Sequence, residues 1–212
     1  MKMLEETRRH INRLIEEVGR LAESELPPSE FYAEVLKRVL TAMAAPAGAV
    51  WARTSQGNLQ LQFQINMREV GLDRTEQAKL THDELLRRAV LNPQPMHLLP
   101  HSGSGPAEEG KVAAGNPTDF LLLLVPVLLN NEVQGFLEVW QSPDRPMNAV
   151  PGFLQFMSTV ADLAARYVRN QLMGQMAGQQ QVWTQLESFA RQVHASLKPL
   201  EVSTSSPTRA AV

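Results

Sequence analysis

One stretch of the sequence, residues 120–140, constrains the fold most, because it joins two apolar runs through a sharp polar break. All ten residues of 120–129 are apolar, residues 130–132 read Asn-Asn-Glu, and residues 133–140 are again largely apolar. Asparagine tolerates the positive φ that a tight hairpin turn demands. The run is too short, and too interrupted by Pro126, for the roughly 20 apolar residues that span a bilayer. The stretch therefore predicts a buried β-hairpin.

Length and composition bound the class of protein. The 212 residues, 43% of them hydrophobic, suffice for one domain with extra helices or for two small domains. The formal net charge of −2 gives no electrostatic case for a nucleic-acid partner or an anionic membrane. The sequence has no cysteine, which excludes disulfides, thiolate zinc sites and thiol nucleophiles. The first residues lack the hydrophobic segment of a secretory signal, so we expect a cytoplasmic protein without direct membrane insertion.

Three helices are predicted before the hairpin. Residues 1–25 form an N-terminal helix with a narrow apolar stripe, whose near-heptad spacing favours pairing with another helix. A second helix begins near Ser29, a plausible N-cap, and ends near Pro46. A third begins at Thr81, because Thr81 and Glu84 have the spacing of a capping box, and it stops before Pro93.

Three further strands and one long loop are predicted. Residues 47–53 form a short strand, and residues 59–65 alternate apolar side chains with glutamines, as a half-buried strand does. We favour a solvated face for these glutamines over contact with a partner. Residues 95–100 are bounded by prolines and suit an edge strand. Residues 101–118 contain four glycines and two prolines, so they predict a mobile surface loop that is either a lid or tolerated slack.

The C-terminal part predicts one long helix. Apolar residues recur at helical spacing after Phe153, and no proline follows until Pro199, which allows more than forty residues, or roughly 65 Å, of helix. Residues 174–198 form a predicted coiled-coil extension with an apolar stripe, and Gly174 and Gly178 mark a weak point before it. The stripe consists of Val182, Leu186, Phe189, Val193 and Leu197.

The last residues read differently from the rest. Residues 199–212 are predicted to be a disordered polar tail. Residues 197–202 nevertheless echo residues 26–31, as though a second copy of the domain began there. We therefore hypothesise a truncated or shortened relative of a tandem-domain protein.

The order of these elements resembles the GAF family of regulatory domains over residues 26–173. Four segments carry the resemblance: LPPSEFYAEVLKRVL, AGAVWAR, LLLVPVLLNNEVQGFLEVWQS and FLQFMSTVADLAARYVRNQL. In the hairpin, Pro126 and Gly135 match the usual pattern of the family. The resemblance implies an α+β fold, GAF/PAS-like, with a central antiparallel sheet, helices on one face, and terminal helices that often extend into dimer coiled coils.

A more particular resemblance concerns the architecture of longer proteins. The chain is similar to the amino-terminal GAF unit of bacterial proteins that continue into a second GAF unit and then a membrane-fusion adaptor segment of export pumps. This sequence contains no adaptor segment.

Few residues are candidates for chemistry. His97 and His101 are the best candidates for metal ligands, but in an extended segment their Cα atoms would lie about 13 Å apart, too far to share one ion. We therefore favour ordinary histidines and predict no metal, cofactor or catalytic residue. Trp51 and Trp140 could stack on a planar ligand, although aromatic residues on core strands usually serve packing.

The glycine-rich loop offers no better site. Gly103 and Gly105 lack the third glycine of a dinucleotide fingerprint, and Ser104 lacks the flanking pattern of a nucleophile elbow. Glu108 and Glu109 are adjacent carboxylates in a loop that would not hold them in catalytic geometry. No nucleophile, base and orienting group can be assembled, so we do not predict an enzyme.

Two functions remain in view. The resemblance implies a regulatory signalling domain in which small-molecule sensing is coupled to the packing of the terminal helices. The absence of cysteine argues against an attached bilin, and the NKFDE pattern of cyclic-nucleotide-binding members is not visible, so the ligand-binding residues stay unassigned. The alternative is a ligand-free structural module that forms a homodimer, because the stripes of the first and last helices would both be uncovered in a monomer.

Overall fold

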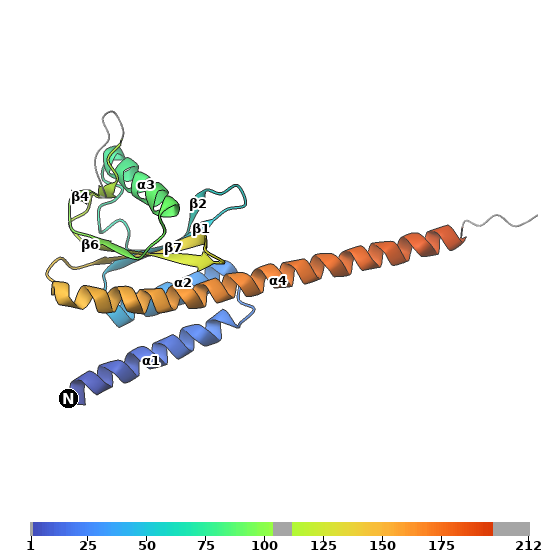
Figure 1. Cartoon of the computed structure of the whole chain (residues 1–212), viewed down its shortest axis with the longest axis horizontal. Coiled ribbons are helices and arrows are strands. Elements are labelled where there is room, and N and C mark those ends of the chain that lie inside the picture. Colours follow the sequence, from blue (N-terminus) through green and yellow to red (C-terminus); the bar gives the residue numbers. More distant parts are fainter. Residues whose placement is uncertain (1, 104–111, 197–212) are drawn as a thin grey trace, which may run out of the picture. The chain divides into compact units, whose positions relative to one another are not determined.

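The computed structural model describes residues 2–103 and 112–196 as a mixed α+β chain (Figure 1). It divides into two compact units, residues 1–170 and residues 171–212. Four helices and seven strands make up the described part: α1 (Lys2–Ala22), α2 (Pro28–Met43), β1 (Ala47–Arg53), β2 (Leu59–Ile65), α3 (Glu76–Leu91), β3 (Met96–Leu98), β4 (Ser102–Gly103), β5 (Gly115–Asn116), β6 (Leu121–Leu129), β7 (Glu132–Gln141) and α4 (Val150–Ser196), with a 3-10 turn at Met147–Ala149 before α4.

The central sheet has five strands in the order β2-β1-β7-β6-β3, and every neighbouring pair is antiparallel. The predicted hairpin is confirmed as β6 and β7, which lie at the middle of this sheet. Asn130 and Asn131 have φ values of 52° and 65°, the positive angles that a two-residue hairpin turn requires. The hairpin is therefore the part of the sequence around which the other strands are arranged.

The strand pairing explains why a proline is tolerated at position 126 and why a glycine is needed at position 135. β3 pairs only with Leu122, Leu123 and Leu124, so Pro126 lies where β7 alone flanks β6, and a proline is tolerated there. A Cβ atom on Gly135 would lie 2.0 Å from the backbone oxygen of Trp51. Glycine is needed at this position because β1 and β7 approach too closely for any side chain.

The predicted α+β fold with a central antiparallel sheet is confirmed. Helices cover both faces of this sheet rather than one, because α3 packs on the face opposite α2 and α4 (Figure 1). On one face, Leu123 and Val139 belong to a core shared with α2 and α4. On the other face, Leu122 and Trp140 share a core with Leu85 of α3. Because side chains alternate along a strand, the nearly continuous apolar runs of β6 and β7 supply both cores at once.

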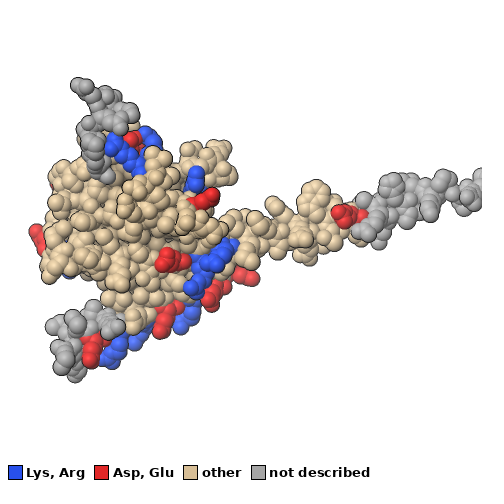
Figure 2. All heavy atoms as spheres, viewed as in Figure 1, with Lys and Arg blue, Asp and Glu red and all other residues tan. Residues whose placement is uncertain are grey.

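The apolar stripe of α1 is covered within the first unit. Leu14, Val18 and Ala22 are buried, and the last two belong to the core that includes α2. The expectation that this stripe would be uncovered in a monomer is wrong, because α2 presents an apolar surface on which α1 lies. Figure 2 shows acidic and basic side chains alternating along the visible outer face of α1, which is the solvated side of this amphipathic helix.

Two predicted helix starts differ from the structure. α2 begins at Pro28 without a side-chain cap, one residue before Ser29. α3 begins at Glu76, where the side chain of Thr75 accepts a hydrogen bond of 3.1 Å from the Ala78 amide. The capping box at Thr81 is therefore wrong, because an equally suitable cap six residues earlier precedes good helix-forming residues.

The alternating strand 59–65 is confirmed as β2, although its apolar residues do not share one face. The register shifts so that Val50 pairs with Phe63 while Trp51 pairs with Leu61. This β-bulge places one extra residue on β2 and reverses the alternation. Phe63 therefore packs on the α2 side, whereas Leu59 packs on the α3 side.

The second unit is described only by its helical residues 171–196, and α4 passes through Gly174 and Gly178 without a break. The predicted tail 199–212 and the repeat-like residues 197–202 lie outside the described residues, as do Ser104, Gly105, Glu108 and Glu109. Among the described helices, none is both long and apolar enough to cross a membrane.

Candidate functional site

A cavity of about 310 Å³ opens on the α3 side of the sheet. Its walls come from β1, β2, α3 and the segment that joins β2 to α3. Leu72 and His82 are buried within it, and Trp51 and Met67 are half-buried. Its lining residues are Trp51, Leu61, Gln64, Met67, Arg68, Leu72, Asp73, Lys79, His82 and Asp83. The charged members of this set are all exposed except His82, so charge gathers at the rim and apolar surface lies deeper.

Local turn chemistry positions the segment between β2 and α3. Asn66 has a φ of 55°, and its amide nitrogen donates a hydrogen bond of 2.9 Å to the Pro46 carbonyl. Gly71 has a φ of 77°, which favours glycine, before the chain turns into α3. Between these two turns the segment directs Val70 into the core on the α3 side, where Leu72 also packs. The wall of the cavity is thereby anchored at both ends.

A buried polar network lies at the base of the cavity. His82 Nε2 lies 2.6 Å from Glu138 Oε1, and the Trp51 indole N–H donates to Glu138 Oε2 at 2.8 Å. His82 is 1% exposed and Glu138 is 0% exposed. The three residues come from α3, β7 and β1, so the network joins a helix to two central strands. A buried carboxylate of this kind requires partners, and here both of its oxygens have one.

Opposing effects act on the pKa of His82. Burial lowers it, while the negative charge of Glu138, the hydrogen bond to Glu138 and the nearby charge of Asp83 raise it. The pKa of His82 is raised overall, which favours the imidazolium form and hence a buried ion pair with Glu138. Removing such a pair from water costs free energy that can exceed the attraction between the two charges. The presence of this pair is therefore weak evidence that its role is only to stabilise the fold.

The two tryptophans proposed as stacking platforms have different places. Trp51 lines the cavity, and its ring centroid lies 5.9 Å from that of His82. Trp140 is fully buried below the site, with its centroid 6.0 Å from that of His82, and it is not among the lining residues. Its indole nitrogen has no hydrogen-bond partner within the described part of the chain. Trp51 alone is positioned to contact a ligand in this cavity.

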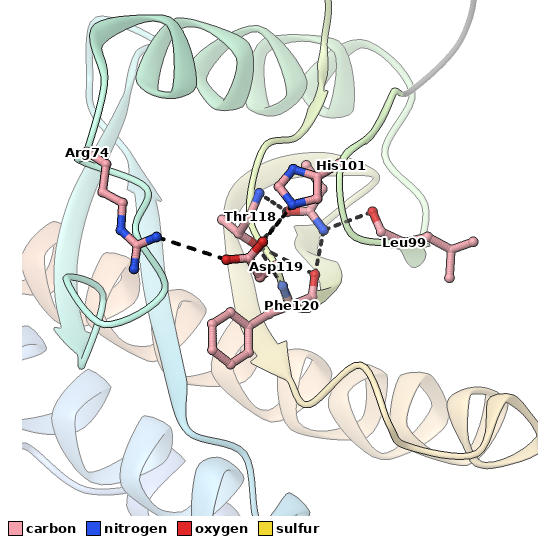
Figure 3. Close-up of polar contacts among 7 residues, drawn as sticks. Arg74, Leu99, His101, Thr118, Asp119 and Phe120 are labelled. Carbon is pink, nitrogen blue, oxygen red and sulfur yellow. Dashed lines mark hydrogen bonds and ion pairs between the residues drawn. The ribbon is translucent and has the colours of Figure 1, made fainter.

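The two histidines singled out from the sequence lie elsewhere. His101 Nε2 lies 2.7 Å from Asp119 Oδ1, and Arg74 approaches the other oxygen of Asp119 at 4.0 Å (Figure 3). Both partners of this pair are more than half exposed. His97 lies on edge strand β3, opposite Leu123. Residues 2–103 and 112–196 contain no group of three or more side chains that could hold a metal ion.

The segment around His101 is held by a structural hydrogen-bond cluster. The Asn116 amide donates a hydrogen bond of 3.2 Å to the Leu98 carbonyl. It also donates to the carbonyls of Leu99 and Phe120 at 3.1 and 2.7 Å, and Thr118 donates to the Asn116 side-chain oxygen (Figure 3). Gly103 lies in β4 and pairs with Gly115 of β5. This arrangement fixes the ends of the long loop, and its polar groups are occupied in doing so.

Sequence reasoning missed His82 and Glu138, although a signal was present for each. Glu138 is a charge within the apolar stretch of residues 136–140, between Leu137 and Val139. His82 shares the buried face of α3 with Leu85, Leu86 and Ala89, at helical spacing. A charged residue and a histidine at two core positions predict a buried pair, because neither is placed in a core without a partner.

Comparisons with known proteins place the fold. No family model matches the chain, and no curated protein matches it by sequence. The similar solved structures include three at 12–19% identity, and similarity at this level bears on the fold alone.

The GAF domain of a putative sensor histidine kinase from Pseudomonas syringae pv. tomato has a TM-score of 0.58 at 19% identity, over 84% of this chain and 98% of that one. The A. aeolicus nlh2 GAF domain in an inactive state has a TM-score of 0.57 at 12% identity, over 78% and 99%. The GAF domain of the potassium sensor histidine kinase KdpD from Escherichia coli has a TM-score of 0.51 at 13% identity, over 77% and 96%. The relationships to tandem-domain proteins and to membrane-fusion adaptors stay predictions. From these similarities, the chain has a GAF-like fold.

Proposed function

We propose that this chain is a regulatory domain that binds a small molecule in the cavity beside Trp51 and His82. The observation that carries the proposal is the position of the cavity, whose base is a buried polar network attached to the central strand β7. Two of the similar domains belong to proteins named as sensor histidine kinases, which agrees with a sensing role. Largely preformed, partly apolar cavities with a few convergent polar groups are the usual form of a small-molecule site.

The strand β7 offers a route from the cavity to the helices on the other face. Glu138 faces the cavity side, and its neighbours Leu137 and Val139 lie in the core that α2 and α4 share. A ligand that moved the Glu138 carboxylate would therefore alter the strand on which Val160 and Ala161 of α4 pack. A ligand shifts such an equilibrium only as far as it binds one arrangement more tightly than the other.

A cavity-blocking variant tests the proposal. Leu61 lines the cavity and is 38% exposed, so Leu61→Trp fills the space with little disturbance of the core. Gln60→Trp, on the same strand but outside the lining, is the matched control. In a thermal-shift screen of small metabolites, a ligand at 100 times its dissociation constant adds about 2.7 kcal/mol to the wild type. The stabilisation should persist in Gln60→Trp and disappear in Leu61→Trp.

Either of two results would count against sensing in this cavity. One is a broad metabolite screen in which nothing stabilises the wild-type protein. The other is a set of ligands that stabilise the wild type and Leu61→Trp equally, since their site would then lie elsewhere.

We also infer a second function, homodimerisation, from the exposed face of α4 in the second unit. Met176, Val182, Trp183 and Leu186 are each more than half exposed. Residues 171–188 contain a single charged residue, Glu187, and the helix surface in this region is almost free of charge in Figure 2. Exposed apolar surface of this kind usually marks an interface, and a second copy of the same helix offers a matching stripe.

Analytical ultracentrifugation of the full chain tests this second function. A dimer is expected at micromolar concentration, and Val182→Asp with Leu186→Asp should convert it to a monomer. The control pair Gln180→Asp with Gln181→Asp adds the same charge beside the stripe and should dissociate it less. A monomeric wild type, or a dimer unaffected by the first pair, would refute dimerisation through α4.

A further inference from the structure

His82 lines the cavity, and its contact with Glu138 uses one of its two ring nitrogens. Nε2 is occupied by Glu138, at 2.6 Å. The side chain is 1% exposed and lines the cavity, and Nδ1 is the ring nitrogen that the contact with Glu138 leaves open. Both ring nitrogens of a histidine can make hydrogen bonds, so Nδ1 is the atom through which a ligand in the cavity can engage the buried ring.

We propose that the cavity takes a small planar carboxylate whose oxygen accepts a hydrogen bond from His82 Nδ1 and whose flat body lies against Trp51. This inference rests on the proposed sensing function and names the class of ligand for it. In this arrangement Glu138, His82 and the ligand carboxylate form a chain, in which Glu138 orients the ring as carboxylates commonly orient functional histidines.

The protonation state of His82 supports a donor at Nδ1. A neutral ring that donates from Nε2 to Glu138 would present Nδ1 as an acceptor, whereas the imidazolium presents it as a donor. Although burial lowers the pKa of His82, Glu138 and Asp83 raise it further, and the raised pKa favours the imidazolium. Hydrogen bonds between an imidazolium and a carboxylate are charge-assisted and stronger than neutral ones.

The other charged side chains around the cavity do not decide whether the ligand is an anion or a cation. Arg68 and Lys79 contribute two positive charges to the lining, and Asp73 and Asp83 contribute two negative ones. All four side chains are exposed, so water and salt screen them. The discriminating group is the buried one, since an interaction excluded from water is worth more than one at a wet rim.

The remaining lining fits a flat apolar body. Leu61, Met67 and Leu72 supply aliphatic surface around the half-buried ring of Trp51. The hydrogen bond of 2.8 Å from Trp51 to Glu138 fixes that ring without using its π face. Offset stacking on such a ring favours planar molecules over bulky ones.

Benzoate and benzamide form the probe pair that tests the inference. They share size and planarity, and benzoate alone carries a carboxylate. The reporter is the indole N–H signal of Trp51 in ¹H–¹⁵N spectra of the labelled full chain, assigned by its loss in Trp51→Phe. At pH 6.5 we expect benzoate to bind about tenfold more tightly than benzamide. A modest charge-assisted hydrogen bond, which benzoate alone can make, produces a ratio of dissociation constants of this size.

The pH dependence supplies a second readout that needs no variant. Benzoate stays ionised well above a carboxylate pKa of about 4, so a change in its affinity above pH 6 reports on the protein. Its affinity should fall as the pH rises through the raised pKa of His82, because the imidazolium loses its proton. The affinity for benzamide should stay constant over the same range.

Variants distinguish the contribution of His82 to ligand preference from that of the exposed cations at the cavity rim. His82→Gln should remove the preference for benzoate, whereas Arg68→Gln and Lys79→Gln, which delete the exposed cations, should change it less than threefold because those charges are screened. Equal binding of both probes at Trp51 would overturn the inference and leave the proposed sensing function standing. No response to either probe would also overturn it, while the sensing function fails separately only if the metabolite screen yields no cavity-dependent ligand.

Discussion

Two histidine–carboxylate pairs in this protein share their chemistry and differ in burial, which allows a sharp prediction. His82 Nε2 lies 2.6 Å from Glu138 Oε1, and the two side chains are 1% and 0% exposed. His101 Nε2 lies 2.7 Å from Asp119 Oδ1, and the two side chains are 62% and 67% exposed. If burial decides the energetic weight of such a pair, the same substitutions should have very different effects at the two sites.

The magnitude follows from what each substitution leaves behind. His82→Leu strands the Glu138 carboxylate in the core, and Glu138→Leu strands the His82 ring, so each should destabilise the fold by about 3–5 kcal/mol. Replacing both with leucine leaves neither charge unpaired and should lie within about 2 kcal/mol of the wild type. The released Trp51 indole is half-buried and can reach water. The equivalent changes in the exposed pair should each stay below about 1 kcal/mol.

Urea unfolding at pH 7, followed by circular dichroism, measures all four corners of each double-mutant cycle. Equal slopes against urea concentration would show that the variants unfold from comparable states. The expected coupling for the buried pair is at least about 4 kcal/mol, and for the exposed pair below about 1 kcal/mol. Single variants at His82 and Glu138 that unfold like the wild type, or whose effects add in the double variant, would show that burial does not decide the energetic weight of this pair.

Three further predictions concern the same fold. Gly135→Ala should destabilise it by about 3 kcal/mol, because its Cβ would lie 2.0 Å from a β1 carbonyl oxygen, whereas Gly152→Ala, with nothing within 4 Å, should be neutral or stabilising in urea unfolding. Tyr167→Phe should lose about 1 kcal/mol in the same assay, since its hydroxyl donates a hydrogen bond of 2.6 Å to the Leu26 carbonyl. Because the folded pKa of His82 is raised, its contribution to stability is complete below about pH 6.5 and is lost as the pH rises through the folded value. A wild-type stability that rises over this interval, or a fall that persists in His82→Gln, would contradict that assignment.

The hairpin and most strands could be predicted from the sequence because their signals are local. A continuous apolar run, an Asn-Asn turn and prolines that bound an edge strand each constrain only neighbouring residues, and β1, β3, β6 and β7 all appear where expected. The start of α3 could not be decided this way, since two capping sequences six residues apart compete and the chain uses Thr75. Local rules rank such alternatives poorly when both precede helix-forming residues.

The candidate site was less predictable because it is assembled across the sequence. Glu138 and His82 are 56 residues apart and meet only when α3 lies over the sheet. The bulge that places Leu61 beside Trp51 depends on register, which the alternation of β2 alone does not reveal. His97 and His101 attracted notice because they are close in sequence, and the structure places them away from the cavity.

Native mass spectrometry shows directly whether a small molecule occupies the cavity beside Trp51 and His82. The full chain is incubated with an extract of small metabolites, together with the cavity-blocked Leu61→Trp and the control Gln60→Trp. We expect one added small molecule per chain on the wild type and on Gln60→Trp, and none on Leu61→Trp. Bare protein in all three samples, or the same added mass on all three, would contradict sensing in this cavity.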